Sequence, residues 1–124
     1  MTEEKTAYLR AKYPRAFETL RWGTFECGDG WAGLIEEFGA FAESRGLSAA
    51  VIKEKWGVLC IQGVQASDEG AVMKDCWPLL VDLETRSASV CETCGAPGRR
   101  VTRGMWWMTR CEVCKPYGRA KLAT

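Results

Sequence analysis

Four of the seven cysteines in this 124-residue chain form two Cys-x-x-Cys pairs, a spacing that constrains the fold more than any other feature. The pairs are Cys91 with Cys94 and Cys111 with Cys114, and sixteen residues separate them. Two-residue spacing lets both thiolates of a pair face one ion, and the intervening segment is long enough to form a hairpin. The sequence therefore predicts a structural four-thiolate zinc site, with two disulfides or four unrelated thiols as the alternative.

Turn residues between the two pairs support the hairpin. Gly95 follows the first pair, where a tight turn needs a residue that tolerates positive φ, and Pro97-Gly98 continues the turn. Two short strands, 99–103 and 105–110, are expected to turn at Gly104. Together these features predict a zinc ribbon over residues 91–124 that is continuous with a core formed by residues 1–90.

The chain contains no histidine, which restricts both the metal site and the available chemistry. Four thiolates complete the tetrahedral coordination of a structural ion and leave no position for a catalytic water. No Cys-His or Ser-His pair exists, and no side chain has an unperturbed pKa near neutrality. We therefore expect a protein that is not an enzyme. The remaining catalytic candidate is a carboxylate cluster of Glu36, Glu37 and Glu54, although neighbouring helical residues such as Glu36 and Glu37 point apart.

The remaining composition predicts a soluble cytoplasmic protein. The chain is 47% hydrophobic with six tryptophans, so it can bury a core. Its first residues lack the basic and apolar regions of a signal peptide, and no apolar run approaches the roughly 20 residues of a membrane span. In a reducing compartment we expect Cys27, Cys60 and Cys76 to be small core residues.

Charge is divided unevenly along the chain. Residues 1–90 carry 10 Lys/Arg and 14 Asp/Glu, a net −4, whereas residues 91–124 carry 7 and 2, a net +5. Zn²⁺ held by four thiolates changes the second figure by −2, to +3, because four negative ligands outweigh a divalent ion. The basic side chains could meet phosphates or a partner protein, or could simply keep a solvated hairpin soluble. They are Arg99, Arg100, Arg103, Arg110, Lys115, Arg119 and Lys121.

Hydrophobic spacing predicts helices in the first part of the chain. The first is expected from Glu3 to about Leu20, with a break or a restart at Pro14. The second is expected from Trp31 to about Arg45, with Asp29 as its N-cap and Gly46 as its C-cap. The apolar stripe of this second helix is Trp31, Leu34, Ile35, Phe38 and Phe41 or Ala42.

A β-hairpin and a further helix are predicted to complete the core. Residues 49–64 alternate as a hairpin that turns at Gly57. A long helix is expected over residues 67–89, and Pro78 inside it predicts a kink near Lys74 or a break. Its buried side is expected to be Val72, Cys76, Leu79, Leu80 and Leu83. The predicted fold class is α+β, with helices packed on a small antiparallel hairpin and a C-terminal zinc ribbon that has four cysteine ligands.

Three segments carry a resemblance to a known family. They are Ile52-Lys53-Glu54-Lys55-Trp56-Gly57-Val58-Leu59, Cys91-Glu92-Thr93-Cys94-Gly95-Ala96-Pro97-Gly98-Arg99 and Trp106-Trp107-Met108-Thr109-Arg110-Cys111. The chain resembles, over residues 31–114, small uncharacterised bacterial and phage zinc-ribbon proteins with a Lys-Glu-Lys-aromatic-Gly strand motif and a Cys-x-x-Cys-Gly-Ala-Pro-Gly knuckle. It has Cys114 where the resemblance leads us to expect histidine, and cysteine ligates zinc at least as well. The resemblance implies a zinc-binding accessory protein of phage or prophage origin.

The first functional hypothesis is a non-catalytic binding protein that modulates or inhibits a host complex, such as a defence complex. Adjacent strand residues point to opposite faces, so one of Trp106 and Trp107 can pack on the core while the other points outward. An exposed tryptophan beside Arg103 and Arg110 has the composition of an interface hot spot. The alternative is that both tryptophans are buried between the ribbon and the helices.

The second hypothesis is nucleic-acid binding through the ribbon. In this case one tryptophan would stack on a base while phosphates are contacted by Arg99, Arg100, Arg103 and Arg110. The expected partner is therefore a host or phage protein complex, with nucleic acid as the second candidate. An exposed aromatic ribbon would also suit self-association, so a homodimer remains open.

Overall fold

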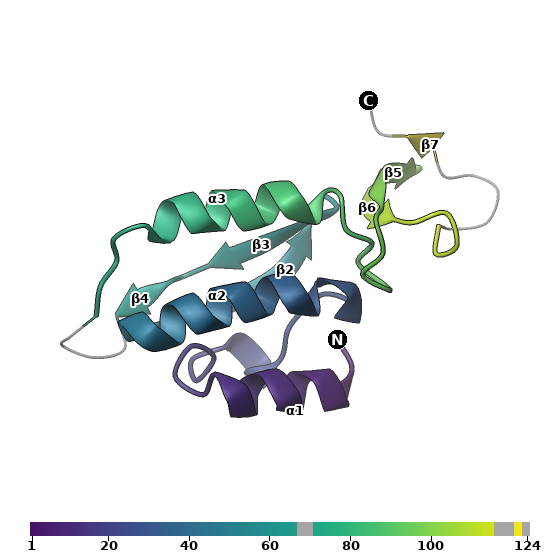
Figure 1. The fold of residues 1–124 in the computed structure, drawn as a ribbon. Helices are drawn as coiled ribbons and strands as arrows, with labels where there is room; N and C mark the ends of the chain where they lie inside the picture. The colour runs from purple at the N-terminus through teal and green to yellow at the C-terminus, as the bar shows by residue number, and fades with distance from the viewer. Residues whose placement is uncertain (67–70, 116–120, 123–124) are drawn as a thin grey trace.

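Helices packed on a small antiparallel hairpin form most of the molecule, and a cysteine-bearing ribbon stands at one end (Figure 1). The computed structural model describes residues 1–66, 71–115 and 121–122. The four cysteines of the two Cys-x-x-Cys pairs lie together in the ribbon. This arrangement confirms the predicted α+β fold class with a C-terminal cysteine cluster.

Helix α1 (Glu3–Lys12) is shorter than the sequence pattern predicts. The Thr2 side chain caps its first turn by accepting a backbone hydrogen bond, as expected for an N-cap residue. The helix ends before Leu20 because Tyr13, at φ −129° and ψ 66°, leaves the helical region ahead of Pro14. A proline disfavours the helical conformation of the residue before it, so the predicted break at Pro14 is confirmed, and no second helix restarts before Leu20.

Helix α2 (Ala32–Arg45) follows a 3-10 turn, η2 (Asp29–Trp31). Gly46 takes the left-handed conformation at the C-cap, with φ 68°, as predicted. The Asp29 carboxylate does not cap α2, because η2 places it one turn too early. It accepts hydrogen bonds from the Thr2 backbone N–H and hydroxyl at 2.9 and 3.0 Å, so it fixes the N-terminus of the chain instead.

The predicted β-hairpin is present as β2 (Val51–Lys55) and β3 (Val58–Gln62), paired antiparallel. The two turn residues, Trp56 and Gly57, both have positive φ, of 55° and 82°. This is the two-residue turn whose backbone twist matches that of the flanking strands. Glu26 pairs with Lys53 in a parallel bridge along the other edge of β2.

The predicted helix over residues 67–89 begins later, as α3 (Cys76–Ser87). Residues 67–70 lie outside the described residues, and residues 71–75 are not helical. Pro78 is therefore the third residue of α3, where a backbone N–H has no intrahelical partner to lose. The predicted kink or break inside a long helix is wrong for this reason.

The core lies between the helices and the β2–β3 hairpin. Its largest fully buried side chains are Trp31, Phe17, Phe25, Phe38, Leu9, Ile35, Leu47, Ile52, Leu59 and Leu83. The predicted core cysteines Cys27 and Cys76 are buried, whereas Cys60 is only half-buried. Val72 is 48% exposed, because it precedes α3 instead of lying on its buried face. Shorter elements complete this part: η1 (Arg21–Gly23), and β1 (Leu47–Ser48) paired with β4 (Gln65–Ala66).

Among the described residues, no helix has both the length and the apolar character needed to cross a membrane.

Candidate metal centre

The cysteine ribbon, residues 91–115, is built around two antiparallel strands. These are β5 (Arg99–Arg103) and β6 (Trp106–Arg110), joined by a turn in which Gly104 has φ 61°. A short strand, β7 (Lys121–Leu122), pairs with the other edge of β5. The predicted strands and their turn at Gly104 are confirmed. The hairpin brings the two Cys-x-x-Cys knuckles back together at its open end.

The four sulfur atoms of Cys91, Cys94, Cys111 and Cys114 lie within 4.8 Å of one another. The sulfur atoms of Cys94 and Cys111 are 3.6 Å apart. Four thiolates placed tetrahedrally at about 2.3 Å from one zinc ion would be about 3.8 Å apart. All four cysteines are free thiols, so the disulfide alternative is not what the structure contains. The cluster fits one four-coordinate metal ion.

The local electrostatics favour a cation at the centre of the cluster. Burial raises the pKa of the Cys91 thiol, but backbone N–H donors, chiefly of Cys94 and Cys111, outweigh burial and lower this pKa to about 6. Hydrogen bonding with the Cys111 thiol raises the pKa of Cys114 to about 12. A metal ion bound between the sulfurs would deprotonate both thiols, since thiols that ligate a metal are deprotonated.

Each knuckle contains the same backbone turn. The Gly95 N–H donates to the Cys91 carbonyl at 2.9 Å, and the Lys115 N–H donates to the Cys111 carbonyl at 3.1 Å. Gly95 has φ 81°, the left-handed conformation that the sequence predicts for this position. Both turns aim the two thiols of a knuckle at a common point.

The first knuckle rests on the loop that precedes α2. The Gly30 N–H donates to the Glu92 carbonyl at 2.7 Å, and the Gly28 N–H donates to the Glu92 carboxylate at 2.9 Å. A Cβ on Gly30 would lie 2.0 Å from the Cys91 carbonyl oxygen, so only glycine permits this contact. Sequence reasoning placed an N-cap, Asp29, in this segment and missed the contact of the two glycines with the knuckle. Two glycines within three residues are more than the start of a helix requires. This excess was the signal in the sequence that could have indicated a close contact.

Glu92 is a further residue that sequence reasoning did not identify. Its carboxylate forms an ion pair with Arg110 at 3.1 Å, and their side chains are only 12% and 22% exposed. The indole N–H of Trp31 donates to the Val90 carbonyl at 2.8 Å and ties the same segment to the core. A carboxylate between the two thiols of a knuckle is unfavourable beside other negative groups unless a cation compensates it. Arg110 provides this compensation for Glu92.

The β2–β3 turn supports the other side of the ribbon. The Thr109 hydroxyl donates to the Gly57 carbonyl at 2.5 Å, and Thr109 is fully buried. A Cβ on Gly57 would lie 3.0 Å from the Met108 backbone nitrogen. The Arg100 guanidinium donates to the Trp56 carbonyl. The ribbon therefore contacts the core at two glycine-containing loops, although the division into a core of residues 1–90 and a ribbon of 91–124 stays a prediction.

Most of the arginines predicted to bind a partner have partners within the protein. Arg99 pairs with Glu112 at 2.5 Å, and Arg110 pairs with Glu92. Arg100 also stacks on the Trp107 ring, 4.5 Å from its centre. Among the described residues, Arg103 is the one of the four whose side chain has no hydrogen bond, ion pair or ring contact.

The two ribbon tryptophans differ in exposure. Trp106 is 72% exposed, whereas Trp107 is half-buried under Arg100. Met105, next to Trp106 at the end of the hairpin, is 92% exposed. The expectation that the two tryptophans point to opposite faces is met, and Trp106 is the outward one.

The carboxylates considered as a catalytic cluster have separate partners. Glu36 pairs with Lys12 at 3.0 Å, Glu37 pairs with Arg86 at 2.6 Å, and the Glu54 carboxylate accepts from the Gly57 N–H at 3.3 Å. The structure does not bring them to one site.

Comparisons of the chain with protein-family models, with curated proteins and with solved structures give no match.

Proposed function

We propose that this chain is a non-catalytic zinc-binding accessory protein that acts through protein–protein contact. Its metal is Zn²⁺, because an all-thiolate tetrahedral site prefers zinc or iron and suits neither magnesium nor calcium. Four cysteines fill the coordination sphere, so the ion stabilises the ribbon instead of activating water. Elemental analysis of the purified protein tests this: one zinc per chain is expected, and iron or no metal would contradict it.

The observation that carries the proposal is the exposed end of the ribbon hairpin. We call this surface the ribbon tip and define it by Arg103, Met105 and Trp106. Met105 and Trp106 are 92% and 72% exposed, and the Arg103 side chain has no recorded partner among the described residues. Tryptophan and arginine are the residues most enriched at the energetic centres of interfaces, and methionine adapts its shape to a partner.

The kind of partner follows from the resemblance of the three sequence motifs to small bacterial and phage zinc-ribbon proteins. On that basis the chain is a phage or prophage modulator or inhibitor of a host complex, such as a defence complex, and it acts in the cytoplasm. A rigid metal-stabilised ribbon suits this role, because a preformed surface loses little conformational entropy on binding.

Affinity purification from lysate of the source cell, with and without nuclease, tests this function. We expect a stoichiometric protein partner that survives nuclease and that is lost in Trp106→Ala. The control is Trp22→Ala, which removes another tryptophan, 76% exposed, from the opposite end of the sequence. Loss of the partner in both variants, or in neither, would contradict binding through the ribbon tip.

Nucleic-acid binding is the second candidate, since the ribbon tip places the Arg103 guanidinium beside an exposed indole that could stack on a base. Among the described residues, Arg99, Arg100 and Arg110 have internal partners that compete with phosphates. Titration of labelled single-stranded DNA and RNA at low salt separates the two. Binding that falls steeply with salt and disappears in Arg103→Ala would favour this candidate.

A further inference from the structure

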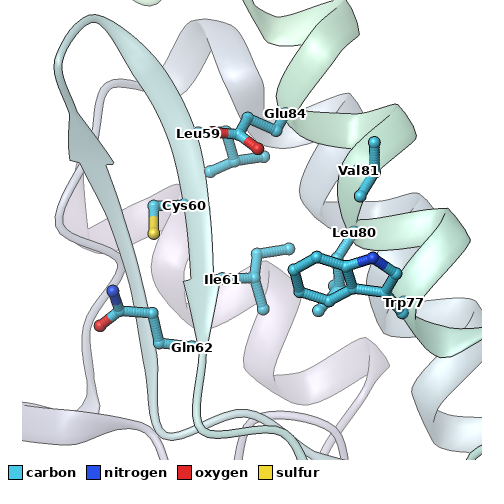
Figure 2. A pocket seen from close by; sticks show the side chains of 8 residues that line it. All are labelled: Leu59, Cys60, Ile61, Gln62, Trp77, Leu80, Val81 and Glu84. Carbon is cyan, nitrogen blue, oxygen red and sulfur yellow. The ribbon is translucent and has the colours of Figure 1, made fainter.

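The outer edge of β3 and the adjacent side of α3 enclose a groove that lies outside the ribbon. Two adjoining hollows of about 230 and 450 Å³ share Ile61, Trp77 and Leu80 in their walls. Figure 2 shows Leu59 and Ile61 pointing from β3 toward α3, with the Trp77 indole beside Ile61. We call this the β3 groove and define it by Leu59, Ile61, Trp77, Leu80, Val81 and Glu84.

The backbone along one side of this groove is an open sheet edge. The two-residue turn makes Val58, Cys60 and Gln62 the residues whose backbone groups bond to β2, because hydrogen-bonded pairs alternate in an antiparallel ladder. The backbone groups of Leu59 and Ile61 therefore point away from β2. The Ser87 hydroxyl accepts the Leu59 N–H at 2.8 Å, whereas no partner is recorded for the Ile61 N–H within the described residues.

The opposite wall of the groove is apolar and exposed. Trp77 is 73% exposed and Val81 is 41% exposed, on the side of α3 that faces the groove (Figure 2). Leu80 lies between them and is half-buried. A strand added to β3 would point alternate side chains toward this wall, because side chains of a strand alternate between its two faces.

One end of the groove is acidic. Glu84 lines the groove near Leu59, and its carboxylate has no recorded ion pair or hydrogen bond among the described residues. Arg86, the nearest cation in α3, already pairs with Glu37 and Asp82. A cationic side chain on a bound segment would complement the Glu84 carboxylate.

We propose that the β3 groove binds an extended peptide segment of a partner protein, which adds as a strand to β3. The segment has apolar residues at alternate positions that pack on Trp77, Leu80 and Val81, and a Lys or Arg that faces Glu84. Its backbone bonds to the Ile61 N–H and to the outward carbonyls of Leu59 and Ile61, since the Leu59 N–H already bonds to Ser87. This mode is known as strand addition. The β3 groove shares no residue with the ribbon tip, so either proposal can fail while the other stands.

A second copy of this chain fits the groove less well than a peptide. Two copies joined through their β3 edges would form one continuous sheet, with both α3 helices on the same face beside the seam. Since α3 already contacts β3 closely enough for Ser87 to bond to Leu59, the second helix would compete for the same space. A single extended strand brings no helix with it.

The direct test uses the full protein and a pool of acetylated, amidated octapeptides in which Val, Leu, Ile or Phe alternates with Thr and one end carries Lys. We expect binding that changes the tryptophan fluorescence of the protein, a change that should be absent in Trp77→Ala, and that slows hydrogen exchange of the Ile61 amide. Two N-methylated versions of a selected peptide supply a matched control. Methylation of the alternate amides that face β3 should abolish binding, and methylation of the other set should not.

Variants of the protein locate the site. Trp77→Ala should weaken peptide binding at least about tenfold, as loss of a central aromatic anchor does. Trp22→Ala, a change of equal size at another exposed tryptophan, should leave binding unchanged. Glu84→Lys should reverse the preference from a Lys-ended to a Glu-ended peptide, by about two- to fivefold in each direction. Because Trp77 and Glu84 are both exposed, these variants should keep their fold.

Three outcomes would overturn the proposal. The first is that no peptide of the pool binds. The second is that binding persists in Trp77→Ala or ignores the position of N-methylation. The third is that the Ile61 amide becomes protected as protein concentration rises without peptide, together with dimerisation in sedimentation, which would assign the edge to a second copy of the chain.

Discussion

The core and the cysteine ribbon bury very different amounts of apolar surface. Residues 1–66 and 71–90 assemble a continuous cluster of buried side chains that includes Trp31 and Phe38. The described ribbon buries only Cys91, Val101 and Thr109. A segment this small cannot bury enough apolar surface to offset its loss of conformational entropy. We therefore propose that the ribbon depends on a bound metal ion and on its contacts with the core, whereas the core is stabilised by its own buried side chains.

Removal of a metal ligand should have the strongest effect. Cys111→Ser should abolish stoichiometric zinc binding and unfold residues 91–115, because the free energy of metal binding is folding free energy in a site of this kind. Metal content and near-ultraviolet circular dichroism measure it. The control is Cys60→Ser, a half-buried cysteine outside the cluster, which should keep one zinc per chain. Equal zinc loss in both variants would contradict the assignment of the four ligands.

The next largest effect should come from a substitution that leaves a cavity in the core. Phe38→Ala should lower the free energy of unfolding by about 3–5 kcal/mol, the usual cost of removing a buried phenylalanine. Urea denaturation followed by tryptophan fluorescence measures it. The folded fraction should still bind one zinc, since Phe38 belongs to the core cluster and is not one of the four cysteine ligands. Loss of zinc from protein that remains folded would show that core and ribbon are more tightly coupled than their burial suggests.

Substitutions of two glycines test the contact between the core and the ribbon. Gly30→Ala should lower the free energy of unfolding of the ribbon by more than about 2 kcal/mol, because its Cβ would lie 2.0 Å from the Cys91 carbonyl. Gly33→Ala is the matched control, since nothing lies within 4 Å of its Cβ position in α2. That change should stabilise the helix by about 0.5–1 kcal/mol. Competition with a colourimetric chelator measures how firmly the ribbon holds zinc, and thermal melting measures the change in stability from the helix substitution.

The weakest effect concerns the carboxylates of the ribbon. Glu92→Gln should lower the free energy of unfolding by about 1–3 kcal/mol, because it weakens a mostly buried ion pair with Arg110 and a hydrogen bond from Gly28. Glu112→Gln removes an exposed carboxylate that pairs with Arg99 and Lys115, and it should leave the melting temperature unchanged. Equal shifts of the melting temperature in the two variants would contradict the role of Glu92 in joining the ribbon to the core.

Cys-x-x-Cys spacing, glycine turns and alternating patterns predicted the ribbon, the β2–β3 hairpin and most of α2. These features depend on local sequence periods and on turns that few residue types can form. The break of the first helix at Pro14 was predicted, although the alternative of a restarted helix up to Leu20 was not found. The predicted start of α3 was wrong, because the helix begins at Cys76 and Pro78 lies in its first turn.

Contacts between distant segments could not be predicted in the same way. The first knuckle contacts the core through the hydrogen bond between Gly30 and Glu92, and β6 contacts it through the hydrogen bond between Thr109 and Gly57. Nothing local to either glycine specifies its partner, because the contact depends on how the hairpin and α2 pack. The β3 groove was missed for the same reason, since it lies between two elements that the sequence predicts separately.

Hydrogen exchange with and without a strong zinc chelator would show whether the ribbon depends on its metal while the core does not. Chelation should remove protection from amides in residues 91–115 and from the Gly28 and Gly30 amides that bond to Glu92. Amides of α2 and of β2 should keep theirs, because the core is stabilised by its own buried side chains. Loss of protection throughout the chain, or no loss anywhere, would contradict a metal-dependent ribbon on an independent core.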